Sequence, residues 1–175
     1  PGEYKGQASL VYRQEANGRF RDVTRELGMY RPDSKCMGIT VYDYDEDGDL
    51  DVFQGNDHQE NFLFQSDGRG RFRDVAPGAG VTVNDQGIPT GSMHGSIGDV
   101  DGDGLVDLLV TDLRHGALYR NTGEGLFEDI TVESGVHKAF NGKGVWAAVL
   151  FDYDNDGDLD IFSANGAADL LGEQP

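Results

Sequence analysis

One acidic string recurs three times along the chain, and its spacing limits the folds that the chain can adopt. The strings are DYDEDGDLD at residues 43–51, DVDGDGLVD at 99–107 and DYDNDGDLD at 152–160. Their first aspartates are separated by 56 and 53 residues. A period of this length is typical of repeat folds, in which each unit packs against its neighbours.

The segments that flank each string repeat with it. Upstream, each copy has a phenylalanine followed two residues later by an aspartate, at Phe20, Phe72 and Phe127. Downstream lie the apolar runs DVFQGN, DLLVTD and DIFSAN, which are typical of strands. The middle copy is predicted to contain four strands, at about residues 61–66, 70–75, 92–98 and 106–111. With 26 glycines and no long helical periodicity, the chain is predicted to be all-β.

A repeat of about 53 residues with four antiparallel strands matches one blade of a β-propeller. We therefore predict a single repeat region over residues 1–175. Its blade-like units lie at about 8–58, 59–113 and 114–167, and residues 168–175 begin a linker to a possible further blade. Three units are fewer than the roughly four that close the smallest propellers. The expected fold is a partial propeller whose ends contact further blades of the same polypeptide or a protein partner.

The alternating aspartates suit a hard cation. Carboxylates at positions 1, 3 and 5 of each string can converge on one point, while glycine at position 6 permits a sharp reversal. Position 7 is leucine in the second string, so this position is predicted to ligate through its backbone carbonyl in all three. We predict three Ca²⁺ ions, with Asp49, Leu105 and Asp158 as the carbonyl ligands. The full ligand sets are Asp43, Asp45, Asp47, Asp49 and Asp51; Asp99, Asp101, Asp103, Leu105 and Asp107; and Asp152, Asp154, Asp156, Asp158 and Asp160.

Two other interpretations of the acidic strings fit less well. An EF-hand needs a glutamate at position 12, where this chain has Gln54, Val110 and Ser163. Alternatively, the Asp-Gly pairs could simply form hairpin turns, with the other aspartates as solvated decoration. A turn needs only one or two aspartates, however, and three empty loops with about four clustered carboxylates each would repel themselves.

Charge and composition narrow the possible partners. The formal net charge of −18 argues against nucleic acid and against an anionic membrane surface. The three strings hold 14 aspartates and one glutamate, which leaves 17 of the 32 acidic residues against 14 basic ones, so the acidity belongs to the loops. A single cysteine, Cys36, excludes an intrachain disulfide framework. No apolar run is long enough for membrane insertion.

The repeat resembles a known family. The unit ALYRNTGEGLFEDITVESGV followed by WAAVLFDYDNDGDLDIFSANG is similar to the FG-GAP/VCBS repeat, and most similar to the cartilage-acidic-protein-like (ASPIC/UnbV) group. That family includes the integrin α-subunit propeller. The resemblance covers essentially the whole chain, and it implies propeller blades with calcium-bound hairpin loops and the ligand sets given above. The departures are VYRQ for LYRN in the first copy, FLFQS in the second, and Leu105 in the second loop.

Two classes of function follow from these observations. The first is a noncatalytic calcium-binding module for extracellular protein interaction or adhesion, or a structural subunit of a larger complex; it would be secreted, periplasmic or on the cell surface. The alternative is the propeller portion of a secreted hydrolase or lyase, or a glycan-binding module. The histidines occupy separate repeat positions and no nucleophile is paired with a base, which favours the noncatalytic class. They are His58, His94, His115 and His137.

Residues just before the acidic strings carry two further expectations. The small residues there are predicted to lie on a strand crowded near a central axis. They are Gly38, Gly95, Ala147 and Ala148. Trp146 aligns with Met37 and Met93 and is predicted to be part of the core, with a sugar-stacking platform as the lesser alternative.

Overall fold

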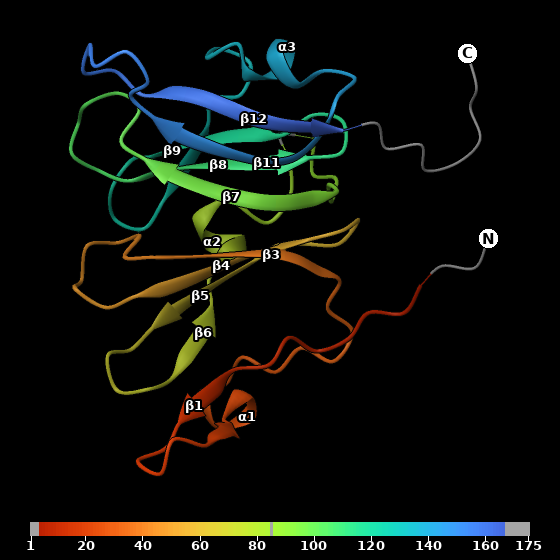
Figure 1. Ribbon diagram of the computed structural model, residues 1–175, viewed down its shortest axis with the longest axis vertical. Coiled ribbons are helices and arrows are strands. Elements are labelled where there is room, and N and C mark those ends of the chain that lie inside the picture. Colours follow the sequence, from red (N-terminus) through yellow and green to blue (C-terminus); the bar gives the residue numbers. More distant parts are fainter. Residues whose placement is uncertain (1–3, 85, 167–175) are drawn as a thin grey trace.

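The computed structural model describes residues 4–84 and 86–166. Within these ranges the elements are short antiparallel strands and one-turn helices, which confirms the predicted all-β class. The sheets follow one another along the long axis of the molecule, from β1 at one end to β12 at the other (Figure 1). The linker predicted at 168–175 lies outside the described residues.

Two four-stranded sheets form the middle of the molecule, and in each the order of the strands in space follows the chain. The first sheet consists of β3 (Cys36–Tyr42), β4 (Asp51–Asn56), β5 (Phe62–Ser66) and β6 (Phe72–Asp74). The second sheet consists of β7 (Ser92–Gly98), β8 (Asp107–Asp112), β9 (Ala117–Asn121) and β10 (Phe127–Asp129). Both are antiparallel meanders, as expected for propeller blades.

Each end of the described chain carries a two-stranded hairpin. The N-terminal hairpin pairs β1 (Tyr12–Gln14) with β2 (Phe20–Asp22), and the C-terminal hairpin pairs β11 (Gly144–Phe151) with β12 (Asp160–Gly166). By their sequences and registers, the N-terminal hairpin corresponds to the outer strands β5–β6 and β9–β10. The C-terminal hairpin corresponds to the inner strands β3–β4 and β7–β8.

The sheets are therefore offset from the predicted repeat units. The four segments predicted for unit 59–113 are strands, but they do not form one blade: β5 and β6 belong to the first sheet, and β7 and β8 to the second. A sequence period gives the length of a unit but not its starting point. The lengths of the links between strands set the starting point. The short link 57–61 keeps β5 next to β4 in one sheet. The link 75–91 from β6 to β7 is long and contains α2 (Ala76–Ala79).

The inner strands β3, β7 and β11 lie side by side, with β7 in contact with both of the others. The approach of β3 to β7 is close, because the Thr40 hydroxyl donates to the Gly95 carbonyl at 2.8 Å. A Cβ atom on Gly38 would lie 2.2 Å from the Met93 carbonyl oxygen. Glycine is thus required where the inner strands meet, which confirms the predicted crowding at Gly38 and Gly95.

Each inner hairpin carries a β-bulge at the same place, and the bulged residues are Met37, Met93 and Trp146. Met93, on the central inner strand, is 6% exposed, whereas Met37 and Trp146 are 48% and 42% exposed. The prediction that Trp146 is a core residue is wrong for this structure, because 42% of the residue is exposed.

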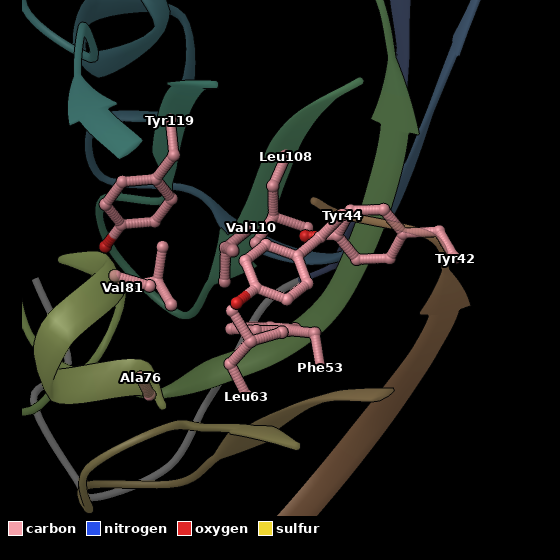
Figure 2. Packing of buried hydrophobic residues seen from close by; sticks show 10 residues of the cluster. Tyr42, Tyr44, Phe53, Leu63, Ala76, Val81, Leu108, Val110 and Tyr119 are labelled. Atoms are coloured by element: carbon pink, nitrogen blue, oxygen red, sulfur yellow. The ribbon is translucent and has the colours of Figure 1, made fainter. Parts of the chain in front are cut away.

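The hydrophobic core lies between sheets rather than within one. One cluster joins Phe53 and Leu63 of the first sheet, Ala76 of α2, and Leu108 and Val110 of the second sheet (Figure 2). A second cluster joins Leu109 and Leu118 with α3 (Val136–Phe140) and with Val145 and Ala148 of the C-terminal hairpin. Because side chains alternate along a strand, Leu108 and Leu109 serve opposite interfaces.

The recurring phenylalanine-x-aspartate motif has a structural role. Asp22 Oδ1 accepts hydrogen bonds from the backbone nitrogen and the hydroxyl of Thr24, which opens α1 (Thr24–Leu27). Asp129 makes the same two contacts with Thr131. The threonine hydroxyl in turn accepts the backbone N–H of Val11 in the first copy, as it does from Leu118 in the third. These aspartates therefore join the end of the outer hairpin to the turn that covers the core.

Candidate metal centres

The three acidic loops connect the two strands of the three inner hairpins and share one backbone conformation. In each loop the glycine at position 6 has a positive φ, with values of 90° at Gly48, 94° at Gly104 and 100° at Gly157. This conformation lets the glycine N–H donate to the position 1 carboxylate. The distances are 2.9 Å to Asp43, 2.9 Å to Asp99 and 3.0 Å to Asp152. The role predicted for glycine in the loop reversal is thus confirmed.

The structure brings together the carboxylates of positions 1, 3 and 9 in every loop. In each group the potential ligand oxygens lie within 4.8 Å of one another. The groups are Asp43, Asp45 and Asp51; Asp99, Asp101 and Asp107; and Asp152, Asp154 and Asp160. In the first loop the Oδ1 atoms of Asp43 and Asp45 are buried and have no hydrogen-bond partner. Buried carboxylate oxygens of this kind suit a hard divalent cation.

The remaining predicted ligands lie outside these groups. The position 5 carboxylates turn back onto their own loop and accept the N–H of position 7. These contacts are Asp47 with Asp49 at 2.9 Å, Asp103 with Leu105 at 2.8 Å, and Asp156 with Asp158 at 3.0 Å. The Asp49 carboxylate packs against the neighbouring turn, 2.3 Å from where a Cβ of Gly68 would lie. Ligation by position 5 and by the position 7 carbonyl stays a prediction.

The position 9 aspartates link the loops to the sheets. One oxygen of Asp51 accepts from Tyr44 N at 3.2 Å and the other from Ser66 N at 2.7 Å, on the next strand. Asp107 makes the same pair of contacts, with Val100 N and Asn121 N at 2.8 and 2.7 Å. Both aspartates are fully buried. Among the described residues Asp160 accepts only from Tyr153 N, at 3.3 Å, and it is partly exposed.

Burial raises the pKa of Asp51 to about 6. The backbone amides of Ser66 and Tyr44 act in the opposite direction, and the negative charges of Asp45 and Asp47 raise the pKa further. The pKa of Asp107 is raised for the same reasons, with burial again as the largest cause. The ionised loops therefore carry an electrostatic penalty, which a cation bound between the carboxylates would offset.

Two residues that sequence reasoning missed contact position 3 from the neighbouring outer strand. The Gln65 side-chain amide donates to Asp45 Oδ2 in the first loop. At the equivalent position of β9, the Arg120 guanidinium lies 4.0 Å from Asp101 Oδ2. In the sequence, both residues occupy the third position of the recurring LYRN segment. Only the pairing of the strands shows that this position faces the adjacent acidic loop.

A cavity of about 270 Å³ lies outside the acidic loops. It brings together His115 and His137, which the sequence pattern had assigned to unrelated positions. Its two carboxylates are engaged by backbone: Asp112 accepts from the amides of Arg114 and His115, and Asp129 from that of Thr131. His137 Nδ1 is buried without a hydrogen-bond partner. The cavity thus gathers polar groups from several segments, while its carboxylates serve mainly to shape turns.

Sheets of four antiparallel strands, each with an acidic loop between its inner strands, define a repeat protein of the propeller type. A family model described as FG-GAP-like repeat matches residues 4–54, 43–110 and 99–163. The chain belongs to this family, which confirms the predicted resemblance. None of the helices in the described ranges has the length and apolar content needed to cross a bilayer.

Among curated proteins, the chain is similar to cartilage acidic protein 1. It is 30% identical to the Homo sapiens protein over 175 residues, which covers 90% of this chain and 24% of that protein. Against the Mus musculus protein it is 29% identical over 170 residues, covering 90% and 25%. The chain therefore spans about a quarter of the length of these relatives.

Proposed function

We propose that this chain is a calcium-binding propeller segment that acts as a noncatalytic module for protein interaction or adhesion outside the cytoplasm. The observation that carries the proposal is the repeated convergence of three carboxylates, with two buried oxygens of Asp43 and Asp45 left without partners. Calcium would neutralise each loop and cross-link its carboxylates.

The residues of each loop divide into two tasks. Positions 1 and 3 offer oxygens toward the centre of the loop, and the glycine amide holds the position 1 carboxylate in place. Position 9 contributes to the same centre while it accepts backbone amides, so it ties the bound ion to the sheet. Binding of calcium would therefore stabilise the blades as well as the loops.

The proposed location follows from the chemistry of such loops. Extracellular calcium modules bind with dissociation constants of roughly 10⁻⁴ to 10⁻³ M, which suits the calcium concentration outside cells. Loops with dense acidic charge and little apolar content depend on such an ion for their shape. The family membership and the relatives named for cartilage support a secreted or surface-exposed protein.

Thermal unfolding with and without calcium tests the proposal. Calcium at a hundredfold excess over the dissociation constant adds about 2.7 kcal/mol per site, which at roughly 2–4 °C per kcal/mol is a rise of about 5–11 °C. Each of the variants Asp43→Asn, Asp99→Asn and Asp152→Asn weakens one site, and should therefore lose the rise that this one site contributes. Asp33→Asn, which removes an exposed carboxylate outside the acidic loops, should retain all of it. An unfolding temperature that does not respond to calcium contradicts the proposal.

The cavity with His115 and His137 supports the alternative, in which the segment is a glycan-binding module or part of a secreted hydrolase or lyase. In that case His137→Ala should abolish binding of a saccharide that the unchanged chain retains on a glycan array. His58→Ala, at an exposed position outside the cavity, is the matched control.

A further inference from the structure

Asn121 connects the first acidic loop to the second. It is the last residue of β9, and it is 2% exposed. Its backbone N–H donates to Asp107 Oδ1 of the second loop at 2.7 Å. Its side-chain amide donates to the carbonyl of Tyr44 in the first loop at 2.8 Å, although the two residues are 77 positions apart in the chain. One buried residue therefore contacts both loops, through different atoms.

The orientation of the Asn121 amide follows from its partners. The Nδ2 atom faces two acceptors, the carbonyl oxygens of Tyr44 and of Val106, the second at 3.3 Å. The Oδ1 atom accepts the N–H of Gly123 at 3.0 Å. Since a carbonyl can only accept and an N–H can only donate, the reverse orientation would break all three contacts. A displacement of Tyr44 would therefore disturb Asn121 as well.

Tyr44 in turn lies among the groups of the first candidate metal centre. It stands at position 2 of the loop, between Asp43 and Asp45. Its backbone N–H donates to Asp51 Oδ2 at 3.2 Å. These three aspartates are the ones whose potential ligand oxygens lie within 4.8 Å of one another. The position of the Tyr44 backbone therefore depends on how the three carboxylates are held.

The Tyr44 side chain anchors the first loop to the second sheet. It is 4% exposed and lies among the buried side chains between the two sheets (Figure 2). Its ring stacks on Phe127 of β10, with ring centroids 6.2 Å apart. A Cβ atom on Gly125 would lie 3.2 Å from the Tyr44 hydroxyl oxygen. The first loop thus packs against the outer hairpin of the second sheet, and the hydrogen bond to Asn121 is shielded from water.

We propose that Asn121 is a positioning residue that couples calcium binding at the first loop to calcium binding at the second, an inference that rests on the proposed function. When calcium draws the carboxylates of the first loop together, the Tyr44 backbone is fixed. Asn121 is then already ordered, and its N–H is held in place for Asp107. Each loop should therefore bind calcium more tightly when the other loop is filled, and by linkage the factor is the same in both directions.

The first sheet supplies a matched substitution for Asn121. Strand pairing places Ser66 at the equivalent position, opposite the recurring phenylalanine. Like Asn121, Ser66 caps the position 9 carboxylate with its N–H and accepts the N–H two residues later with its side-chain oxygen. Asn121→Ser should therefore keep both of these contacts. It removes the Nδ2 atom that donates to Tyr44, and so breaks the connection between the loops.

Amide NMR spectra recorded during a calcium titration follow each loop separately. The N–H groups of Gly48, Gly104 and Gly157 donate to the position 1 carboxylates, so each signal should shift as its own loop fills. Comparison of Asp43→Asn with the unchanged chain should show that the second loop, read from Gly104, binds roughly 2- to 12-fold more weakly when the first is empty. This range is the effect of one buried hydrogen bond. Asp99→Asn should weaken the first loop, read from Gly48, by the same factor.

The Asn121→Ser background separates coupling through this residue from a general loss of structure. In that background Asp43→Asn and Asp99→Asn should leave the calcium affinity of the other loop unchanged, while the Gly157 signal still responds to calcium. If the three glycines of the unchanged chain respond to calcium but neither substitution affects the other loop, the coupling is overturned and the proposed function stands. A coupling that persists in Asn121→Ser overturns the role of Asn121. If no glycine signal responds to calcium, the proposed function fails and the coupling fails with it.

Discussion

Phe53, Leu109 and Phe162 stand at the same position of three inner hairpins, yet their exposed fractions are 0%, 0% and 64%. The first two face a completed interface, formed by an outer hairpin, a one-turn helix and the next sheet. The third belongs to a hairpin that has none of these among the described residues. The comparison shows that burial in this fold is supplied by neighbouring units, so one unit cannot form a core alone.

The acidic loops show the same contrast. Asp51 and Asp107 are buried because an amide from the adjacent outer strand caps each carboxylate, at 2.7 Å in both cases. Asp160 remains partly exposed. A sheet and its acidic loop are thus completed together, since both need the outer strand that pairs with the strand beginning at position 9.

The largest expected effect comes from one substitution made at two equivalent positions. Phe53→Ala should lower the free energy of unfolding by about 3–5 kcal/mol, because the side chain is fully buried. Phe162→Ala should change it by less than about 0.5 kcal/mol, because that side chain is 64% exposed. Urea unfolding of both variants measures the difference. Equal losses at the two positions would show that the C-terminal hairpin has a core of its own.

A pH experiment on the calcium-free protein is expected to give an intermediate effect. The pKa of Asp51 is about 6 in the fold, above its value of 3.8 in the absence of the fold, so the folded state binds more protons between about pH 4 and 6. Through this window, the contribution of Asp51 to the free energy of unfolding should therefore decrease as pH rises. Asp51→Asn should flatten this slope, and Asp33→Asn should leave it unchanged.

Saturating calcium should reverse this pH dependence, because protons and calcium compete for the same carboxylates. Chelated and calcium-loaded samples can be compared by urea unfolding at pH 4.5 and pH 7 to measure this. A calcium-loaded protein that is more stable at the lower pH would contradict calcium binding by the ionised loops.

The smallest expected effect concerns the two completed loops. Arg120 lies 4.0 Å from Asp101, whereas neutral Gln65 contacts the equivalent Asp45. Arg120→Gln should raise the calcium affinity of the second loop by roughly 1.4- to 5-fold, because exposed ion pairs are worth about 0.2–1 kcal/mol. Isothermal titration calorimetry measures the change, with Arg69→Gln as a control on an exposed turn. A weaker second loop in Arg120→Gln would mean that Arg120 positions Asp101 rather than competing with the ion.

The sequence predicted those features that depend on local pattern. Alternating apolar runs located the strands, and the spacing of Asp43, Asp45 and Asp51 indicated a convergent site. The features that it did not predict depend on pairing between distant segments. The offset of the sheets, the contact of Gln65 with the first loop, and the cavity that joins His115 to His137 all depend on strand order, which a local pattern does not show.

The sequence pattern also did not predict how the position 5 carboxylates are used. Asp47, Asp103 and Asp156 share the alternation of the other aspartates, and the sequence pattern treats them alike. In the structure each accepts the amide two residues later instead of joining the group of three. An aspartate at such a spacing can form a turn with its own backbone as readily as it can face an ion.

The most direct test of the central claim is a count of bound calcium. The chain is brought to equilibrium by dialysis against calcium at a concentration well above the expected dissociation constant, and the calcium bound per chain is the excess over the outer buffer, measured by mass spectrometry. Three calcium ions per chain are predicted, one for each acidic loop, and two for Asp43→Asn, Asp99→Asn or Asp152→Asn. A content of zero or one ion in the unchanged chain would contradict the equivalence of the three loops.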